Sequence, residues 1–522
     1  MEPSPDRVLE QAEQVQASSD DECSRASAVE QLPDDVLVMV MQHLQLVDLL
    51  ACRLVSKRLG ALAMHPDSWC RQSIDDYVFE DGPRVDTCVV LRLAPCVHSM
   101  RLSSCGQSSL RFITTRCAAR SLSLTLRSLQ PDSNTEVFAQ VVRNQLLLGR
   151  LRSVRLCFTE RVCEELVTLG RGSDALLRTL AAATGLESLV FDTEIPFAVD
   201  RLELAPAYPS LKKFHCLLTR EAESFVNTVL AGHAATLEDV ALCPGRPFQY
   251  WVAYDKRTLG TATASLLAGM PRLRRLRCLV LPGLEAVAAV ETLTDLSLVA
   301  FHLDSPEAAV ALLRRAKQLR QVSLLFLENM HSLRDGSKRI LAALASQSHV
   351  ESLTVSGKLP PLEPLARALP ALPALRELSV LQGPMDGELV VVQSITPYAT
   401  PALRRLELSW EELNCPRRCV HAWVHLDAVK TALTDNPSLH ILLHNPGACS
   451  DRNCQACAED CHTELKRLTW KPSGGVSWAT SEEKVGLFSY EPGACSSPRD
   501  HVPRDHVTGK WWRWVQVRHA SG

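Results

Sequence analysis

Four cysteines and one histidine in the last fifth of the chain are the residues whose types and spacing most suggest chemistry. The group consists of Cys449, Cys454, Cys457, Cys461 and His462. Thiolates and imidazole at short spacing can bind zinc, and the C-x4-C-x2-C run with Cys495 as a distant fourth ligand could hold an iron–sulfur cluster. The spacing fits no standard zinc finger. Reduced thiols in an insertion between two strands are therefore the alternative, and we assign no metal or cofactor.

Motifs of catalysis and phosphate binding are absent from the sequence. It contains no G-x-x-x-x-G-K-[ST] loop, no helix-opening G-x-G-x-x-G, no H-E-x-x-H and no G-x-S-x-G. His, Asp and Glu are plentiful but form no local constellation that implies catalysis. The sequence thus predicts a protein that binds other molecules and is not an enzyme.

The elements that must position any binding side chains follow a repeated pattern, L-x-x-L-x-L with apolar substitutes. Twelve copies begin at residues 151, 186, 211, 237, 273, 293, 319, 350, 375, 403, 439 and 465, and two weaker copies begin at 97 and 119. The mean period of about 28 residues lies in the range of leucine-rich repeats. In a short strand, the fourth and sixth positions point to one side and the third and fifth positions to the other.

Helical patterns lie between these strands, at residues 135–148, 174–184, 221–231, 306–316, 338–345 and 426–433. Because strand and helix alternate, consecutive strands should be parallel and side by side, with the helices outside. The fold class is therefore α/β, a curved solenoid in which each repeat buries its apolar face against its neighbours. The repeats resemble the long, helix-containing leucine-rich repeat, and their uneven period predicts an irregular curve. An ordinary α/β domain with leucine-rich strands is the alternative.

Basic residues recur at the third and fifth repeat positions, which face the concave side of such a solenoid. The substrate-binding candidates among them are Arg155, Lys213, Arg275, Arg277 and Arg405. Guanidinium groups bind carboxylates and phosphates, so these residues could form a patch for an acidic or phosphorylated protein. Ser, His, Asp and Glu share these positions, so an ordinary solvated face of mixed charge is the alternative.

Residues 31–69 read as three short helices with too small a core to be stable alone. We expect Pro33 to start the first helix, Asp48 to cap the second, and Pro66 to start a third that carries Trp69 and Ile74. The first helix has an apolar stripe formed by Leu37, Val40, Met41 and Leu44. So much apolar surface on so short a unit predicts a partner that covers it.

An ordered set of residues in this stretch resembles the F-box. The set is Leu32, Pro33, Leu37, His43, Leu44, Asp48, Leu49, Leu50, Arg53, Val55, Ser56, Lys57, Arg58 and Trp69. The resemblance implies docking onto the adaptor of a cullin–RING (SCF-type) ubiquitin ligase. The implied adaptor-binding residues are Leu32, Pro33, Val36, Leu37, Val40, Met41, Leu44, Leu49, Leu50, Val55 and Trp69. An ordinary three-helix piece of a larger core is the alternative.

Composition bounds the rest of the chain. A net charge of −3 over 522 residues argues against a general nucleic-acid binder. The chain shows no apolar signal segment and no membrane-spanning run, and we expect reduced thiols and a cytoplasmic or nuclear location. We divide the chain into a disordered leader (1–29), the F-box (30–78), a junction turn at 81–84, the repeats (84–470) and an irregular tail (471–522).

The tail ends in a tryptophan-rich run formed by Trp511, Trp512 and Trp514 with Lys510 and Arg513. These rings could stack on nucleic-acid bases, but a tail that folds back over the last repeat is the favoured interpretation.

Together these features predict the substrate-recognition subunit of an SCF-type ligase. The adaptor and a cullin are its expected partners, and an unidentified protein is its substrate. The resemblance implies that it acts by proximity, because it holds a target near the conjugating enzyme. A leucine-rich-repeat scaffold or inhibitor that acts by binding alone is the alternative. A regulator that senses metal or redox state through the cysteine group is a further one.

Overall fold

A computed structural model shows the arrangement of most of the chain. It describes residues 32–75, 87–103, 109–126, 131–158, 174–195, 208–243, 262–300, 306–327, 334–383, 385–410, 420–444, 484–491, 494–495 and 513–517. Several predicted features lie outside the described residues, namely the leader 1–29, the turn 81–84, the cysteine group at 449–462, the repeat copy at 465–470, Trp511 and Trp512. The chain forms two compact units, of which unit 1 is Met1–Val162 with Arg171–Thr179 and unit 2 is Cys163–Gly170 with Leu180–Gly522.

The described part of unit 1 starts with helices and continues with parallel strands. Its helical start comprises α2 (Asp34–Met41), α3 (Leu46–Val55), α4 (Lys57–Ala63) and the 3-10 turn η1 (Pro66–Trp69). The elements β1 (Ser73–Asp75), α5 (Thr87–Leu93), β2 (Cys96–Ser103), α6 (Ser109–Ile113), β3 (Ala118–Leu126), α7 (Pro131–Leu147) and β4 (Ser153–Phe158) follow. Strands β1 to β4 pair in chain order, and every pair is parallel. The division between the units falls within α9 (Asp174–Ala181).

Unit 2 repeats the alternation of strand and helix. Its first half comprises β5 (Ser188–Phe191), β6 (Lys213–His215), α10 (Glu223–His233), β7 (Asp239–Ala241), α11 (Ala262–Ala268), β8 (Arg275–Leu279), η3 (Leu284–Ala289), β9 (Asp295–Ala300) and α12 (Glu307–Arg315). Its second half comprises β10 (Gln321–Phe326), α13 (Arg334–Ala343), η5 (Leu344–Ser346), β11 (Ser352–Gly357), α14 (Glu363–Ala368), η6 (Leu369–Ala371), β12 (Glu377–Gly383), α15 (Met385–Ser394), β13 (Arg405–Trp410), α16 (Val420–His425), α17 (Asp427–Asp435), β14 (His440–His444), β15 (Lys484–Ser489) and β16 (Arg513–Val517).

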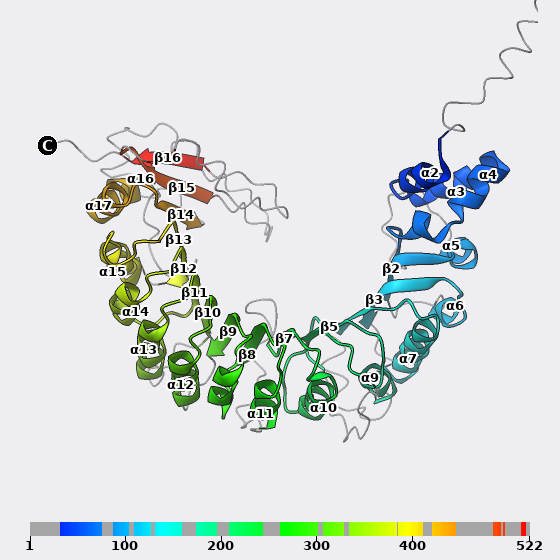
Figure 1. The fold of residues 1–522 in the computed structure, drawn as a ribbon, viewed down its shortest axis with the longest axis horizontal. Helices are drawn as coiled ribbons and strands as arrows, with labels where there is room; N and C mark the ends of the chain where they lie inside the picture. Colours follow the sequence, from blue (N-terminus) through cyan, green and yellow to red (C-terminus); the bar gives the residue numbers. More distant parts are fainter. Residues whose placement is uncertain are drawn as a thin grey trace, which may run out of the picture. The chain divides into compact units, whose positions relative to one another are not determined.

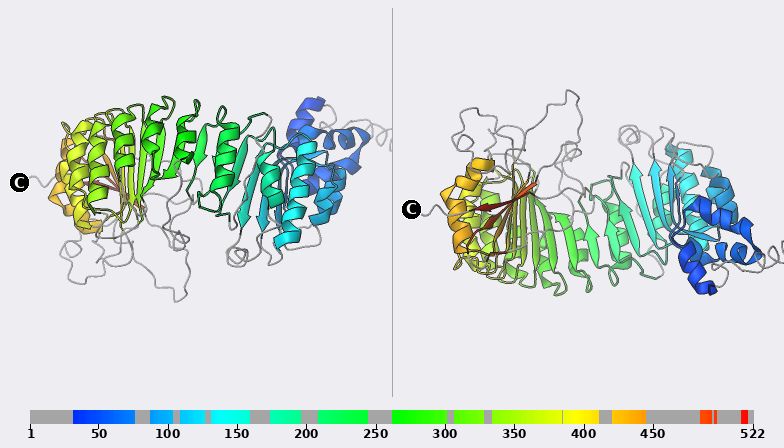
Figure 2. Two further views of the ribbon diagram at one scale, coloured as in Figure 1. Left: turned by 90° about the horizontal axis from the view of Figure 1, so that it is seen from below. Right: turned by 90° about the horizontal axis from the view of Figure 1, so that it is seen from above.

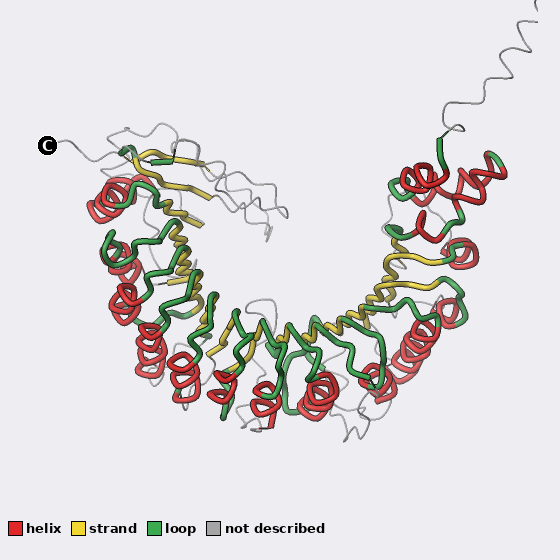
Figure 3. Tube along the Cα trace, in the orientation of Figure 1, coloured by secondary structure: helices red, strands yellow, loops and turns green. Residues whose placement is uncertain are grey.

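The strands of unit 2 from β5 to β14 pair in parallel with their sequence neighbours (Figure 2). Within this unit, helices α10 to α15 line one side of the strand layer, as Figures 1 and 3 show. The predicted α/β class with parallel neighbouring strands is confirmed within each unit. All six predicted helical segments fall on observed helices, namely α7, α9, α10, α12, α13 and α17.

The core of unit 2 lies between strands and helices and is built from the fourth and sixth repeat positions. In β9 to β13 these side chains are at most 2% exposed; they are Leu296, Leu298, Val322, Leu324, Leu353, Val355, Leu378, Val380, Leu406 and Leu408. Helix α12 faces the same core with Val310, Leu312 and Leu313. Each layer thus buries its apolar side chains against the next one, which is how stacked repeats share a core.

The helical start of unit 1 differs from the prediction in two places. The predicted third helix is only the 3-10 turn η1. Ile74 lies in strand β1, because residues 73–75 pair with β2 and do not continue the helix. The second helix, predicted to carry Val55, Leu59 and Leu62 together, is divided into α3 and α4 at Ser56. The Ser56 hydroxyl accepts a hydrogen bond from the Leu59 N–H at 3.2 Å. Asp48 is in the first turn of α3, and Gln45 occupies its N-cap.

The repeat copy at 439 is out of phase with its prediction by one residue. His440 pairs with Arg405, and Ile441 pairs with Leu406, so Ile441 and Leu443 enter the core with no exposed surface. The pattern had assigned His444 to the core, but it lies on the opposite face. A slip of one residue exchanges the two faces of a strand.

Part of the predicted irregular tail forms strands that extend the sheet. Strand β15 pairs antiparallel with β14, and β16 pairs parallel with β15. Trp514 covers Gly486, since a Cβ on this glycine would lie 2.4 Å from the indole ring. The same ring makes edge contacts with His440 and Phe488 at centroid distances of 5.5 and 6.2 Å. Residues 484–489 and 513–517 thus extend the sheet at β14. The last predicted repeat copy, at 465–470, lies outside the described residues, so the expectation that the tail folds back over it stays a prediction.

Candidate functional site

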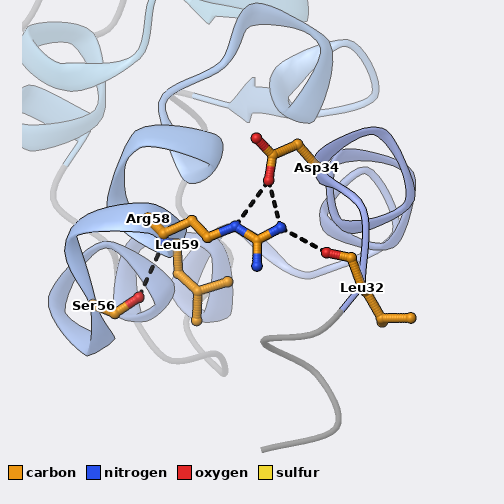
Figure 4. Close-up of polar contacts among 5 residues, drawn as sticks. All are labelled: Leu32, Asp34, Ser56, Arg58 and Leu59. Carbon is orange, nitrogen blue, oxygen red and sulfur yellow. Dashed lines mark hydrogen bonds and ion pairs between the residues drawn. The ribbon is translucent and has the colours of Figure 1, made fainter. Parts of the chain in front are cut away.

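The helical start of the chain is held together at its surface by Arg58. Its guanidinium on α4 reaches the segment before α2 (Figure 4). Nε and Nη2 of Arg58 donate to Oδ1 of Asp34 at 2.8 and 2.6 Å, and Nη2 also donates to the carbonyl oxygen of Leu32 at 2.6 Å. The two oxygens belong to Leu32 and to Asp34 at the start of α2, so this clamp fixes how Leu32 and Pro33 are presented to solvent.

Four predicted adaptor-binding residues form the interior of this helical unit. Leu37, Met41, Leu49 and Trp69 are at most 3% exposed. The indole nitrogen of Trp69 donates to the carbonyl oxygen of Ala63 at 2.7 Å, which satisfies its polar group inside the core. These four side chains thus pack inside the unit in the chain alone, and their role in adaptor binding stays a prediction. They hold the helices in place.

Other apolar side chains of the same helices are uncovered. Leu32 is 36% exposed, Val40 51% and Val55 68%, all three of which were predicted, and Pro33 is also exposed. Sequence reasoning missed three more residues with large exposed fractions, namely Met39 (54%), Val47 (41%) and Leu54 (86%). The remaining predicted residues are half-buried, namely Val36, Leu44 and Leu50.

A signal for the missed residues exists in the sequence. Every residue from 36 to 41 is apolar, and a short helix that is apolar all round cannot bury its whole circumference in a small unit. Of the predicted stripe, Leu37 and Met41 are buried, whereas Val40, like Met39 outside the stripe, is left exposed.

This helical unit is joined directly to the strands that follow it. The side-chain amide of Gln72 donates to the carbonyl oxygen of Leu44 at 2.9 Å. The Cys96 thiol on β2 donates to the carbonyl oxygen of Pro66 at 3.4 Å. Strand β1 lies inside the predicted range 30–78 and pairs with β2. The sheet of unit 1 therefore starts within the segment that was assigned to the helices.

The face of the strands in unit 1 carries small hydroxyl groups. Ser73, Ser99, Ser121 and Ser153 stand opposite one another in successive strands. Ser99 Oγ donates to Ser73 Oγ at 2.8 Å. Arg155, a predicted substrate-binding residue, is exposed on β4 in register with Ser123.

In unit 2 the corresponding face carries charges that pair across strands. Lys213, Asp239 and Arg275 stand in register on β6, β7 and β8. Asp239 Oδ1 lies 3.2 Å from Nε2 of His215, and its Oδ2 lies 3.1 Å from Nη2 of Arg275. Desolvation is the largest single effect and raises the pKa of Asp239, but the hydrogen bond and charge of His215 with the nearby cations hold this pKa below its usual value.

A second paired group lies on β12 to β14. Arg405 donates to Glu407 Oε1 and also lies 3.7 Å from Glu377. Glu407 accepts a hydrogen bond from Ser379 at 3.1 Å and lies 3.7 Å from His444. Burial raises the pKa of Glu407, but His444 and Arg405 outweigh burial and hold the pKa at about 2. This carboxylate is fully compensated and supports the face structurally.

In unit 2, the predicted basic residues are interleaved with carboxylates and do not form one continuous basic patch. In unit 2, Arg275 and Arg405 are engaged with carboxylates and lie on strands separated by β9 to β12. Arg277 is exposed on β8 and has no ion pair with the described residues. The mixed-charge face that the sequence left open as an alternative is what unit 2 displays. Among the described residues, no group of three or more His, Cys, Asp or Glu side chains is placed to hold a metal ion.

The chain thus combines a small helical unit that has exposed apolar side chains with parallel strands and helices that follow it in the sequence. Residues 29–71 match the F-box domain family, so the chain carries an F-box domain. In SCF-type ubiquitin ligases, this domain binds the adaptor. A comparison with curated proteins gives no match to the chain. Within the part of the chain that the structure describes, no helix has the length and apolar character needed to cross a bilayer.

Proposed function

We propose that this chain is a substrate receptor of an SCF-type ubiquitin ligase. The observation that carries the proposal is the set of uncovered apolar side chains on α2 and α3, within residues that match an F-box. Leu54 and Val55 at the end of α3 are 86% and 68% exposed. Large exposed apolar side chains in one small unit favour a protein partner. In this proposal the partner is the ligase adaptor, to which a cullin is attached.

The rest of the chain would act as the substrate-holding part. We interpret the parallel strands with helices on one side, and the mean period of about 28 residues, as a leucine-rich-repeat solenoid. Such an array would hold a target protein near the conjugating enzyme and raise its effective concentration there. The receptor itself would supply no catalytic residue. The division into an F-box at 30–78 and repeats at 84–470 belongs to this proposal.

Co-precipitation with matched leucine variants tests the proposal. The full chain should capture the adaptor and a cullin from cell extract, and Leu54→Asp should abolish this capture. Leu147 on α7 is 87% exposed and lies outside the F-box match, so Leu147→Asp is the matched control and should capture both proteins.

Two outcomes of the co-precipitation would contradict the proposal. If the wild-type chain captures neither protein while its thermal unfolding is cooperative, the ligase assignment is wrong, and a scaffold or inhibitor that acts by binding alone replaces it. If Leu54→Asp and Leu147→Asp capture the adaptor equally well, docking does not use the end of α3.

A further inference from the structure

Backbone hydrogen bonds of unit 2 define a continuous row of residues that crosses the sheet at the N-terminal ends of its strands, which we call its N-terminal edge. Each residue in the row directly precedes a strand, and each after the first donates its N–H to the carbonyl oxygen of the row's residue one strand earlier, at 2.7–3.0 Å. We call this row the edge ladder; its members are Glu187, Lys212, Glu238, Arg274, Thr294, Arg320, Glu351, Arg376 and Arg404. Their side chains are therefore brought side by side although they come from nine repeats.

The part of the edge ladder at β8 to β13 is strongly positive. It contains four arginines and one glutamate, which gives a formal charge of +3; its members are Arg274, Thr294, Arg320, Glu351, Arg376 and Arg404. The neighbouring row, the first residue of each of these strands, has two cations and two anions and sums to zero; its members are Arg275, Asp295, Gln321, Ser352, Glu377 and Arg405. The positive charge is thus concentrated on the edge and absent as a net charge from the adjoining face.

The arginines of this edge are only partly compensated. Arg320 pairs with Glu351 at 2.9 Å, and Arg404 donates to the hydroxyl of Ser438, which leaves its charge unneutralised. Arg274 and Arg376 are exposed, and their side chains make no hydrogen bond or ion pair with the described residues. Arg376 and Arg404 stand on adjacent strands, where like charges destabilise a sheet. A bound anion would remove this repulsion.

The spacing of the arginines matches an extended polypeptide. Arg274, Arg320 and Arg376 precede alternate strands, so they are about 9.6 Å apart, and Arg404 is about 4.8 Å further on. An extended chain in the polyproline II conformation advances about 3.1 Å per residue with three residues per turn, so every third side chain points the same way. It would therefore meet these arginines with every third residue and then with the next one, over about eight residues.

We propose that the edge ladder at β8 to β13 binds an extended acidic segment of a protein partner. Carboxylates of Asp or Glu on this segment accept paired hydrogen bonds from the guanidinium groups of Arg274 and Arg376. Arg320, which lies between these two arginines, and Arg404, which follows Arg376, bind further carboxylates of the same segment. That this segment belongs to a ubiquitination substrate rests on the proposed function, whereas the binding itself does not.

Fluorescence anisotropy of the full chain with a labelled peptide tests the inference. The probe is a peptide of about eight residues with glutamate at positions 1, 4, 7 and 8 and Gly or Ser elsewhere, and the matched peptide has glutamine at those positions. The glutamate peptide should bind, the glutamine peptide should not, and the affinity should fall steeply as salt is raised. The double variant Arg274→Glu/Arg376→Glu should weaken binding about tenfold or more, since both sites change from attraction to repulsion.

The control variant is Lys338→Glu/Arg367→Glu, which makes the same charge change on helices α13 and α14 of the same unit. It should bind the glutamate peptide like the wild type, and both double variants should unfold at wild-type temperature. Equal binding of the two peptides, or equal effects of the two double variants, would overturn the inference. So would single-stranded DNA that competes with the peptide at equal charge, because the edge would then attract any polyanion.

Adaptor capture by the same variants separates this inference from the proposed function. Arg274→Glu/Arg376→Glu should capture the adaptor as the wild type does. If the double variant loses peptide binding but still captures the adaptor, both proposals are supported. If the wild type captures the adaptor but binds no peptide, only the edge-ladder proposal is wrong. If the wild type binds the peptide but captures no adaptor, only the ligase assignment is wrong.

Discussion

The helices α2 and α3 and the strand layer of unit 2 treat their apolar side chains in opposite ways. Leu54 on α3 is 86% exposed, whereas Leu378 and Leu406 on β12 and β13 have no exposed surface. A short helical unit has too little interior for all its apolar residues, but each strand of a stacked array is covered by the next layer. The first region can offer large exposed apolar side chains to a partner, whereas the face and edge of the second offer mainly polar and charged groups.

This contrast predicts two kinds of binding in one chain. Association through α2 and α3 should depend on apolar burial and respond weakly to salt. Association through the edge ladder should depend on charge and respond strongly to salt. The following substitutions test whether the two regions differ as described, in order of decreasing expected effect.

The same change of residue should have very different costs in the two regions. Leu378→Ala should lower the free energy of unfolding by about 3–5 kcal/mol, because it leaves a cavity in a closed core. Leu54→Ala should change it by less than about 0.5 kcal/mol, since the side chain is already in water. Urea denaturation monitored by circular dichroism measures both values, and similar costs would refute the contrast.

Gly357 at the end of β11 tests how tightly the strand layer is packed. Its φ is +88°, and a Cβ would lie 2.1 Å from the Phe326 carbonyl oxygen of the neighbouring strand. Gly357→Ala should therefore cost about 3 kcal/mol, from backbone strain together with a backbone clash. Gly149 has a φ of +77° but nothing within 4 Å, so Gly149→Ala should cost only about 1 kcal/mol. Equal shifts in thermal unfolding temperature would show that the clash is relieved cheaply.

The interior of unit 2 should also disfavour a protonated, positively charged histidine. His233 at the end of α10 is fully buried, and its Nδ1 accepts hydrogen bonds from the backbone N–H groups of Ser210 and Leu211 at 3.0 and 3.3 Å. Burial lowers the pKa of His233 to about 4 from a usual 6.5. Between these values the unfolded chain binds a proton that the folded chain excludes, so stability falls as the pH falls from 6.5 to 4.

His233→Gln removes this titratable group, and with it the proton that is taken up on unfolding. Thermal unfolding measured across the same pH range should show a smaller loss of stability for the variant than for the wild type. Identical pH slopes for the two proteins would mean that His233 takes up its proton in the folded state.

The Arg58 clamp should have the smallest effect on stability. Both partners are largely solvated, with side-chain exposures of 41% for Arg58 and 65% for Asp34, and such pairs contribute less than about 1 kcal/mol. Arg58→Leu should therefore unfold close to the wild-type temperature. It should still weaken adaptor binding, because it releases the segment of Leu32 and Pro33. A wild-type affinity measured by calorimetry would show that this segment needs no fixing.

The sequence was sufficient where a strong local pattern determined the structure. The spacing of leucines predicted the strands and helices of the repeats. It failed at residue 439 because Leu439, Ile441, Leu442 and Leu443 are all apolar, and either phase fits such a run. It also failed at Ile74, which is placed by pairing with β2, a contact between distant parts of the chain.

The candidate site shows a similar limit. An apolar stripe indicates which side of a helix is buried but not what buries it, and Leu37 and Met41 are already buried in the chain without a partner. The sequence left open whether the basic residues form a patch or part of a face of mixed charge. Some acidic partners, such as Asp239, come from other repeats, and only the register of the strands shows which cation each one meets.

Hydrogen–deuterium exchange of the full chain, with and without purified SCF adaptor, tests the central claim most directly. The account predicts that the adaptor slows exchange in α2 and α3 and leaves the strands β8 to β13 unchanged. Unchanged exchange throughout residues 32–55 at saturating adaptor, or protection confined to the strand layer, would contradict it.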